Sequence, residues 1–264
     1  MHSFIAAFIV SCAAGFASTR GSLRAPAAIP FTFIAYFMLM GFPSQKAALK
    51  KGWSWFEVTY VAASPRSAGK LYKDAVASRW LIGSDIPQGV ANLTVQDAND
   101  ASLALGKCKF VFSALEMGKE EIKALEEAYA AEGIPVVSNA SANRWTDDVP
   151  MLIPEINSAH LDIIKKQQAH HGWDKGFIAV KPNCSLQTYM MPLYALIRAG
   201  YPVKRMIVTT LQAVSGAGYP GVSSFDMIDN IVPYIGGEEE KTERECDALN
   251  FFKGRLFVFG KIKF

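Results

Sequence analysis

The sequence predicts an α/β fold in which helices cover the faces of a parallel sheet. Beyond Trp55, strand-like segments alternate with amphipathic segments of helical period, a pattern typical of βαβ units. The chain has 264 residues, of which 50% are hydrophobic. It is therefore long and apolar enough to bury a sizeable core and to form one large or two ordinary domains.

Three strands and one helix are predicted in the first part of this alternating region. Residues 55–64 (WFEVTYVAAS) and 108–115 (CKFVFSAL) are predicted strands. Residues 119–133 (KEEIKALEEAYAAEG) form an amphipathic helix that ends at Gly133, and residues 134–141 (IPVVSNAS) form a third strand. Ligands of parallel sheets bind at the carboxyl ends of the strands, so site residues are expected where these strands end.

A second, α+β domain is predicted in the last part of the chain. Residues 176–183 (GFIAVKPN) form a strand, a helix follows at Cys184, and residues 204–216 (KRMIVTTLQAVSG) form a long strand before Gly- and Pro-rich loops. We place the domain boundary near Ile156. The predicted parts are an N-terminal segment, a sheet domain and a second domain: residues 1–54, 55–156 and 157–264.

The first 56 residues differ in composition from the rest because they contain no Asp or Glu. Residues 4–16 have the length and apolarity of a secretory signal core, and residues 18–28 are acid-free and contain Ser and Arg, as in a transit peptide. Together they indicate a bipartite plastid pre-sequence, and a cytoplasmic location is the alternative. Residues 1–54 could also be an aberrantly translated segment, a membrane anchor or a buried strand.

Charge and cysteine content exclude several function classes. The net charge is +3, and no Lys/Arg run is interleaved with aromatic residues, so no nucleic-acid partner is predicted. The cysteines are far apart, with no CxxC pair and no Cys/His cluster at metal-ligand spacing, so neither a metal site nor a disulfide scaffold is predicted. Free thiols and a reducing compartment are expected. The four cysteines are Cys12, Cys108, Cys184 and Cys246.

Cys184 stands directly before a run of helical period, at a predicted helix N-terminus. The unpaired N–H groups and partial positive charge of such an end favour a thiolate, which is a nucleophile. The same donors, with Asn183 beside them, could stabilise the oxyanion that forms when a carbonyl is attacked. The alternative is that Cys184 is a small buried hydrophobic residue.

Motifs in a fixed order extend from about Trp55 to about Glu243. They are ASPRSAGKLY (63–72), FVFSAL (110–115), VVSNASANR (136–144), LIPEIN (152–157), KPNCS (181–185), LQAVSGAGYPG (211–221) and NIVPYIGGEEEK (230–241). In order and spacing they resemble aspartate-semialdehyde dehydrogenases of the archaeal and fungal branch. This resemblance implies a Rossmann-like NADP-binding domain, incomplete at its start, followed by a truncated α+β catalytic and dimerisation domain.

The resemblance implies an oxidoreductase that uses NADPH to reduce L-aspartyl 4-phosphate to L-aspartate 4-semialdehyde and releases phosphate, in lysine, threonine and methionine biosynthesis. Cys184 corresponds to the thiol that forms an acyl-enzyme thioester, and thiols suit this role because they attack and leave readily. Gln212 corresponds to the glutamine that orients the substrate. Asn183 is expected to contact the substrate beside the thiol.

Other matched positions imply the binding of the substrate's charged groups. Glu238 corresponds to an acid that holds the substrate amine, and Lys241 to a base that holds phosphate. Arg144 corresponds to an arginine whose planar guanidinium binds the phosphate dianion. Taken without the resemblance, these residues would be solvated helix-start and surface charges.

Six further residues correspond to positions around the cofactor NADP. Ser64, Arg66 and Ser67 follow a strand where such domains bind the adenosine ribose, and a hydroxyl–guanidinium–hydroxyl set there favours a 2′-phosphate. The other three correspond to positions near the nicotinamide: Ser113, Ser215 and Gly216.

Two regions depart from the family pattern. The glycine loop that binds the pyrophosphate should lie near residues 37–43, which instead read FMLMGFP with Gly41 alone. Family members also continue beyond the matched region with a substrate-binding arginine and an acid/base histidine. None of the histidines here matches it, because all precede Cys184: His2, His160, His170 and His171.

These departures leave two alternatives open. The chain could be a catalytically inactive, truncated paralogue that acts as a nucleotide-binding or subunit-interaction module. N-acetylglutamyl-phosphate reductases share the thiol chemistry, but SGAGYPG together with GGEEEK disfavours that family. The resemblance further implies a homodimer or homotetramer for a complete chain, and no stable membrane association is expected.

Overall fold

The computed structural model describes two compact units. The first contains Met1–Pro154 and Ser158–Lys181, and the second contains Glu155–Asn157 and Pro182–Phe264. Within them, the described residues are 7–11, 57–78, 80, 85–114, 117–201, 203, 205–212, 222–248, 255–258 and 262–263.

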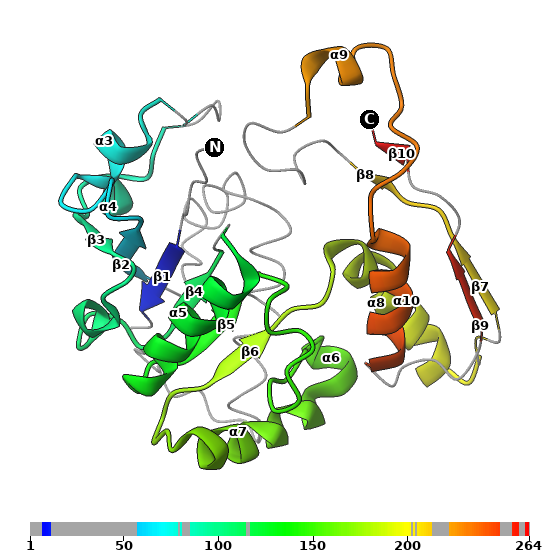
Figure 1. Ribbon diagram of the computed structural model, residues 1–264. Coiled ribbons are helices and arrows are strands. Elements are labelled where there is room, and N and C mark those ends of the chain that lie inside the picture. The colour runs from blue at the N-terminus through cyan, green and yellow to red at the C-terminus, as the bar shows by residue number, and fades with distance from the viewer. Residues whose placement is uncertain are drawn as a thin grey trace, which may run out of the picture. The chain divides into compact units, whose positions relative to one another are not determined.

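A six-stranded sheet forms the centre of the first unit (Figure 1). Across the sheet, the strands are β3 (Val95–Asp97), β2 (Glu57–Ala63), β1 (Ala7–Ser11), β4 (Val111–Ser113), β5 (Val136–Ser138) and β6 (Ile178–Val180). The predicted strands β2, β4, β5 and β6 are confirmed. They run parallel to one another and to β3, so their carboxyl ends meet at one edge.

Strand β1 departs from the predicted all-parallel sheet. It pairs antiparallel with β2 and with β4, and it comes from the apolar N-terminal run for which a targeting role was expected. An apolar, partly β-branched stretch, AFIVS, suits a strand flanked on both sides. The remaining residues of the N-terminal segment, and with them the stretch 37–43, lie outside the described residues.

Short helices and one long helix accompany the sheet. The predicted amphipathic helix is confirmed as α5 (Lys119–Ala131), and Gly133, with a φ of 79°, directs the chain away from it as expected. The other helical elements of this unit are α3 (Tyr72–Val76), α4 (Gln88–Ala91), η1 (Ala101–Ala104), η2 (Ser158–Asp162) and α7 (Ile163–His171).

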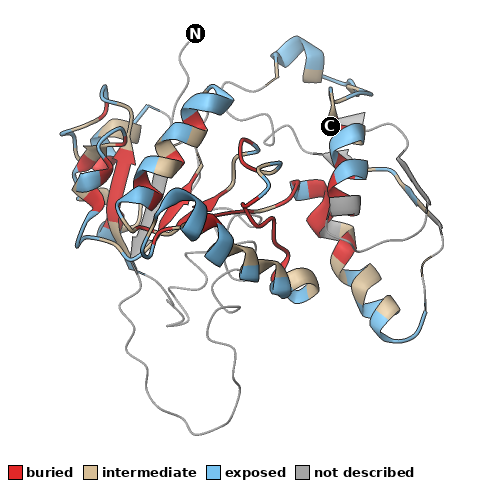
Figure 2. Ribbon diagram, turned by 60° about the horizontal axis from the view of Figure 1, so that its bottom comes forward, coloured by how far each residue is buried: buried red, intermediate tan, exposed pale blue. Residues whose placement is uncertain are grey.

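The core of the first unit lies along the sheet. Figure 2 shows its strands largely buried, whereas the neighbouring helices are exposed along their outer sides. Helix α5 packs against β5 and β6, and its buried stripe includes Ile122, Glu126 and Tyr129. A carboxyl group therefore occupies a position of the helix that faces the core.

In the second unit, the segment from Pro182 onward begins with α8 (Cys184–Arg198), the helix predicted to follow Pro182 and Asn183. Helix α8 contacts α10 (Glu238–Ala248), and α6 (Pro154–Asn157) lies where the chain passes between the units. The remaining elements of the second unit are α9 (Ser224–Met227), β7 (Arg205–Val208), β8 (Leu211–Gln212), β9 (Arg255–Val258) and β10 (Ile262–Lys263).

The long strand predicted over residues 204–216 is wrong in its extent. Over residues 205–212 the structure has two short strands, β7 and β8, which belong to separate two-stranded sheets. Residues 204 and 213–216 of the predicted strand lie outside the described residues. Strand β7 pairs in parallel with β9, and β8 pairs in parallel with β10. The partner strands β9 and β10 come from residues 251–264, which contain none of the family motifs. Local sequence pattern therefore could not predict which strands pair with β7 and β8.

The boundary between the units also lies later than expected. The sequence placed it near Ile156, but residues Ser158–Lys181 belong to the first unit. The reason is that β6 extends the first sheet by pairing with β5. Among the residues that the structure describes, no helix is long and apolar enough to span a membrane.

Candidate functional site

The local sequence around Cys184 fixes the start of α8. Asn183 is the N-cap residue, with a φ of -54° and a ψ of 143°, and its side-chain oxygen accepts a hydrogen bond from the backbone N–H of Ser185 at 3.1 Å. Cys184 is therefore the first residue of the helix. Its side chain is exposed, and its Sγ lies 3.5 Å from Oδ1 of Asn183.

Two carboxyl groups of α10 hold this helix start in place. Glu238 accepts hydrogen bonds from Nδ2 of Asn183 at 2.8 Å and from Oγ of Ser185 at 2.9 Å. Glu245, two turns further along α10, accepts one from the backbone N–H of Asn183. Both glutamates are buried. Buried carboxylates require such donors. These hydrogen bonds therefore hold α10 against the start of α8.

This arrangement suits attack on an electrophilic carbon. Cys184 is an exposed residue at the N-terminal, positive end of a fifteen-residue helix. Glu238 is one hydrogen bond from the residue that precedes the thiol. The exposed Cys184 and the buried carboxyl group of Glu238 are thus linked through Asn183.

The other candidates in the second unit are Lys241, Gln212, Ser215 and Gly216. Lys241 is exposed on α10, and its ammonium lies beside Gly237, which has a φ of 68°. Gln212 ends β8 and is paired with Lys263. Ser215 and Gly216 lie outside the described residues.

In the first unit, the candidate residues for the ribose phosphate form a turn at the carboxyl end of β2. The backbone N–H of Ser67 donates to the carbonyl of Ser64 at 2.9 Å. Ser67 is buried beneath the turn, whereas Arg66 is exposed. An exposed arginine at this edge of the sheet can accommodate a 2′-phosphate.

Ser113, at the carboxyl end of β4, is buried and takes part in a network around Glu126. The hydroxyl groups of Ser113 and Ser138 both donate to Oε1 of Glu126, at 2.5 and 2.6 Å, and Nδ2 of Asn143 donates to Oε2 at 2.8 Å. The Ser113 hydroxyl thus points to the core. Burial raises the pKa of Glu126, against the lowering effect of these three hydrogen bonds.

The Glu126 network positions the loop that carries Arg144. Asn143, which immediately precedes Arg144, is anchored to Glu126, and its Oδ1 accepts a hydrogen bond from Thr146 at 3.1 Å. Arg144 itself is half-buried. One carboxyl group thereby connects the ends of β4 and β5 with the loop after β5, at the edge where ligands of such sheets bind.

Sequence reasoning missed Glu126, Ser185 and Glu245. A signal for Glu126 was present, because it lies in line with Ile122 and Tyr129 on the apolar stripe of α5. Glu245 follows Glu238 by seven residues and therefore shares its helix face. For Ser185 there was no comparable signal, since a serine at a helix start is ordinary.

The sequence matches two known families of domains. Residues 47–164 match the family described as semialdehyde dehydrogenase, NAD binding domain, and residues 193–250 match the family described as semialdehyde dehydrogenase, dimerisation domain. Together these ranges cover more than half of the chain.

Similar curated proteins carry the name aspartate-semialdehyde dehydrogenase. That of Methanothermobacter thermautotrophicus is 45% identical over 190 residues, which are 72% of this chain and 52% of the relative. That of Trichophyton rubrum is 42% identical over 193 residues, 73% of this chain and 52% of the relative. The chain therefore spans about half the length of these curated relatives.

A solved structure resembles the fold described above. It is the aspartate-semialdehyde dehydrogenase of Candida albicans, determined with NADP, which is 31% identical with a TM-score of 0.63. The similarity covers 78% of this chain and 60% of that one. It extends the family resemblance from sequence motifs to the arrangement of the elements.

Proposed function

Because this chain belongs to the semialdehyde dehydrogenase family, we propose that it catalyses the NADPH-dependent reduction of L-aspartyl 4-phosphate to L-aspartate 4-semialdehyde. The observation that carries this proposal is the exposed thiol of Cys184 at the start of α8, beside a buried carboxyl group. The test is reduction of NADP⁺ by the purified chain with aspartate semialdehyde and phosphate, the reverse reaction.

The proposed chemistry starts at the sulfur of Cys184. Its thiolate attacks the acyl carbon, a C–S bond forms, and the C–O bond to phosphate breaks, so that inorganic phosphate leaves and a thioester remains. After reduction of the thioester carbon, the C–S bond breaks, and the aldehyde and the thiolate are released. The helix start that surrounds Cys184 stabilises negative charge during both steps.

NADPH, when bound, supplies the hydride that reduces the thioester carbon. The turn of Ser64, Arg66 and Ser67 fits its 2′-phosphate, because an exposed guanidinium and hydroxyl groups stand at the carboxyl end of β2. Ser113, Ser215 and Gly216 are proposed to line the nicotinamide side. The Ser113 hydroxyl is used by Glu126, so its contact with the cofactor would be made by its backbone.

Three residues are proposed to bind the substrate's charged groups, and a fourth to orient its acyl group. Glu238 holds the amine, Arg144 and Lys241 bind the phosphate group, and Gln212 orients the acyl group. Asn183 is proposed to contact the substrate beside the thiol, since its Oδ1 lies 3.5 Å from Sγ of Cys184 and its Nδ2 donates to Glu238.

The match to a dimerisation domain supports self-association. We propose a homodimer or homotetramer whose small-molecule substrates are aspartyl phosphate or aspartate semialdehyde and phosphate. The reaction would supply lysine, threonine and methionine biosynthesis. A plastid location is proposed from the acid-free composition of the first 56 residues.

Replacing Glu238 by glutamine is expected to weaken substrate binding while the fold is kept. The amide oxygen can still accept the hydrogen bonds from Asn183 and Ser185, but the negative charge that attracts the substrate amine is lost. We expect kcat/KM for aspartate semialdehyde to fall by about tenfold to a hundredfold, the value of a hydrogen bond to a charged group. Steady-state kinetics measure this change.

Glu240→Gln is the matched control, because Glu240 is exposed on the same helix. It removes the same charge without touching the start of α8. Equal losses in the two variants would show that Glu238 acts only through net charge and would contradict its assignment to the amine.

Replacing Arg66 by alanine is expected to lower the preference for NADP over NAD. The variant removes the guanidinium proposed to pair with the 2′-phosphate, a group that NAD lacks. Charge-assisted pairs of this kind contribute about 1.5–3 kcal/mol, so KM for NADP should rise by at least about tenfold while KM for NAD changes little. Lys70→Ala, at an exposed position four residues later, is the control and should leave the preference intact.

A further inference from the structure

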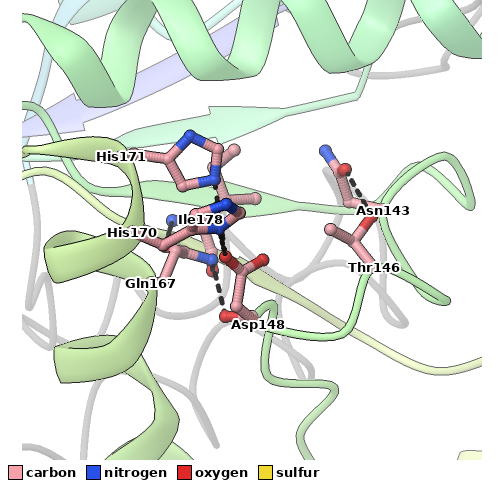
Figure 3. A network of polar contacts seen from close by, with 7 residues as sticks. All are labelled: Asn143, Thr146, Asp148, Gln167, His170, His171 and Ile178. Atoms are coloured by element: carbon pink, nitrogen blue, oxygen red, sulfur yellow. Dashed lines mark hydrogen bonds and ion pairs between the residues drawn. The ribbon is translucent and has the colours of Figure 1, made fainter.

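A histidine pair and a buried carboxyl group converge at the end of α7, among residues for which the proposed reaction has no use. Oδ2 of Asp148 lies 2.6 Å from Nδ1 of His170 and 3.5 Å from Nε2 of His171 (Figure 3). The three potential ligand atoms all lie within 4.8 Å of one another. The sequence predicted no metal site, because Asp148 is far from His170 and His171 along the chain.

The convergence of the two rings is unusual for neighbouring helix residues. Successive side chains of an α-helix point about 100° apart, yet both imidazoles reach the same carboxylate oxygen. His171 stacks on the ring of Trp173, with centroids 4.2 Å apart and an interplanar angle of 16°. This stacking fixes one ring, whereas the side chain of His170 is 70% exposed and can adjust its position.

The backbone around the cluster is held by Gln167, which is buried one turn before the histidines. Its Nε2 donates to the backbone carbonyls of Asp148 and Ile178, at 2.9 and 3.1 Å, and its Oε1 accepts from the N–H of Ile178 at 2.7 Å. The loop of Asp148 is thereby connected to α7 and to β6. Such support beneath potential ligands is what gives a metal site its geometry.

We propose that Asp148, His170 and His171 bind a divalent cation of borderline softness, with zinc as the best match. Two imidazole nitrogens and one carboxylate oxygen are a common zinc donor set, with a water as fourth ligand. Zinc bonds of about 2.1 Å in a tetrahedron separate ligand atoms by about 3.4 Å. The 3.5 Å distance between Nε2 of His171 and Oδ2 of Asp148 already fits, whereas Nδ1 of His170, at 2.6 Å, must move away from that oxygen by less than about one ångström. The two imidazole nitrogens lie within 4.8 Å of each other, and the exposed ring of His170 must also turn so that they reach the spacing of about 3.4 Å.

The cation would connect α7 with the loop that follows β5. Arg144 lies on that loop, four residues before Asp148, so metal binding would restrict the segment that carries a proposed phosphate ligand. The cluster shares no residue with the surroundings of Cys184, and the inference goes beyond the proposed dehydrogenase reaction without depending on it.

Calorimetric titration of the full chain with zinc tests this site. Exposed thiols also bind zinc, so parent and variants all carry Cys184→Ser, and the protein is first stripped with a chelator. At about pH 7.5, where free imidazoles are mostly neutral, the parent should bind one zinc equivalent. The variant His170→Gln/His171→Gln should lose this binding, whereas His160→Gln, a histidine of the same unit outside the cluster, should retain it.

A second variant guards against misfolding of the double mutant. His170→Gln changes one exposed side chain. Loss of a residue that only supports a metal ligand lowers metal affinity by about tenfold to a hundredfold. Loss of a ligand should therefore lower the zinc affinity of this variant by at least as much. Cobalt in place of zinc should give a spectrum without thiolate charge-transfer absorption. Unchanged zinc binding in the folded histidine variants, no binding by the parent, or a thiolate signal would each overturn the proposal.

Discussion

Alanine in place of Cys184 is expected to abolish the reduction of NADP⁺ by aspartate semialdehyde. Without the sulfur no thioester can form, and removal of a covalent nucleophile typically lowers kcat by at least about four orders of magnitude. The side chain is exposed, and alanine is compatible with the first turn of a helix, so the fold should be kept. Steady-state rates and circular dichroism, measured on the same preparation, separate catalysis from folding.

Cys108→Ala is the control for this experiment. Burial raises the pKa of Cys108 to about 11, so its thiol stays protonated at neutral pH and should be neither catalytic nor readily alkylated. The control should retain full activity, and iodoacetamide should label Cys184 much faster. Comparable rates in Cys184→Ala and the wild type would eliminate Cys184 as the nucleophile.

Alanine in place of Glu126 is expected to lower the free energy of unfolding by about 3 kcal/mol. The substitution removes the acceptor of three hydrogen bonds and leaves the Ser113 and Ser138 hydroxyls and the Asn143 amide buried without it. It also opens a cavity between α5 and the sheet. Urea unfolding followed by far-ultraviolet circular dichroism measures the loss.

Glu127→Ala is the matched control, since Glu127 is adjacent on α5 but only half-buried. Its effect should stay within about 0.5 kcal/mol, as for most surface substitutions. If Glu126→Ala were no more destabilising than this control, the carboxyl group would not be holding the strand ends together.

The variant Glu126→Gln tests how the contribution of Glu126 to the free energy of unfolding depends on pH. Because burial raises the pKa of Glu126 above its ordinary value of 4.5, the folded protein retains this proton at a higher pH than the unfolded chain does. The contribution of the group to stability is therefore fully present below pH 4.5 and is lost as the pH rises through the raised pKa. Relative to Glu126→Gln, the wild type should gain stability when the pH is lowered from about 7 towards about 5.

The sequence predicted the elements whose pattern is local. Strands β2, β4, β5 and β6 are short apolar runs, and α5 and α8 have helical period with a glycine stop or an asparagine cap. Each of these signals lies within a few residues of the element that it predicts. The match of the motifs to a family supplied the order of the domains, which no local pattern contains.

What the sequence did not predict depends on pairing over long distances. Strand β1 inserts between β2 and β4, and β9 and β10 pair with strands about fifty residues earlier. The contacts of Asn183 with Glu238 and Glu245 likewise join residues 55 and 62 positions apart. Such contacts depend on tertiary packing. The sequence carried a signal only for the buried position of Glu126 on an apolar stripe and for the helix face that Glu245 shares with Glu238.

Pre-steady-state formation of NADPH tests the central claim most directly. The chain is mixed rapidly with NADP⁺ and aspartate semialdehyde, first without phosphate and then with it. The proposed thioester predicts one equivalent of NADPH per chain without phosphate, continuous turnover when phosphate is added, and neither in Cys184→Ala. Continuous turnover without phosphate, or a folded chain that forms no NADPH under either condition, would contradict the assignment.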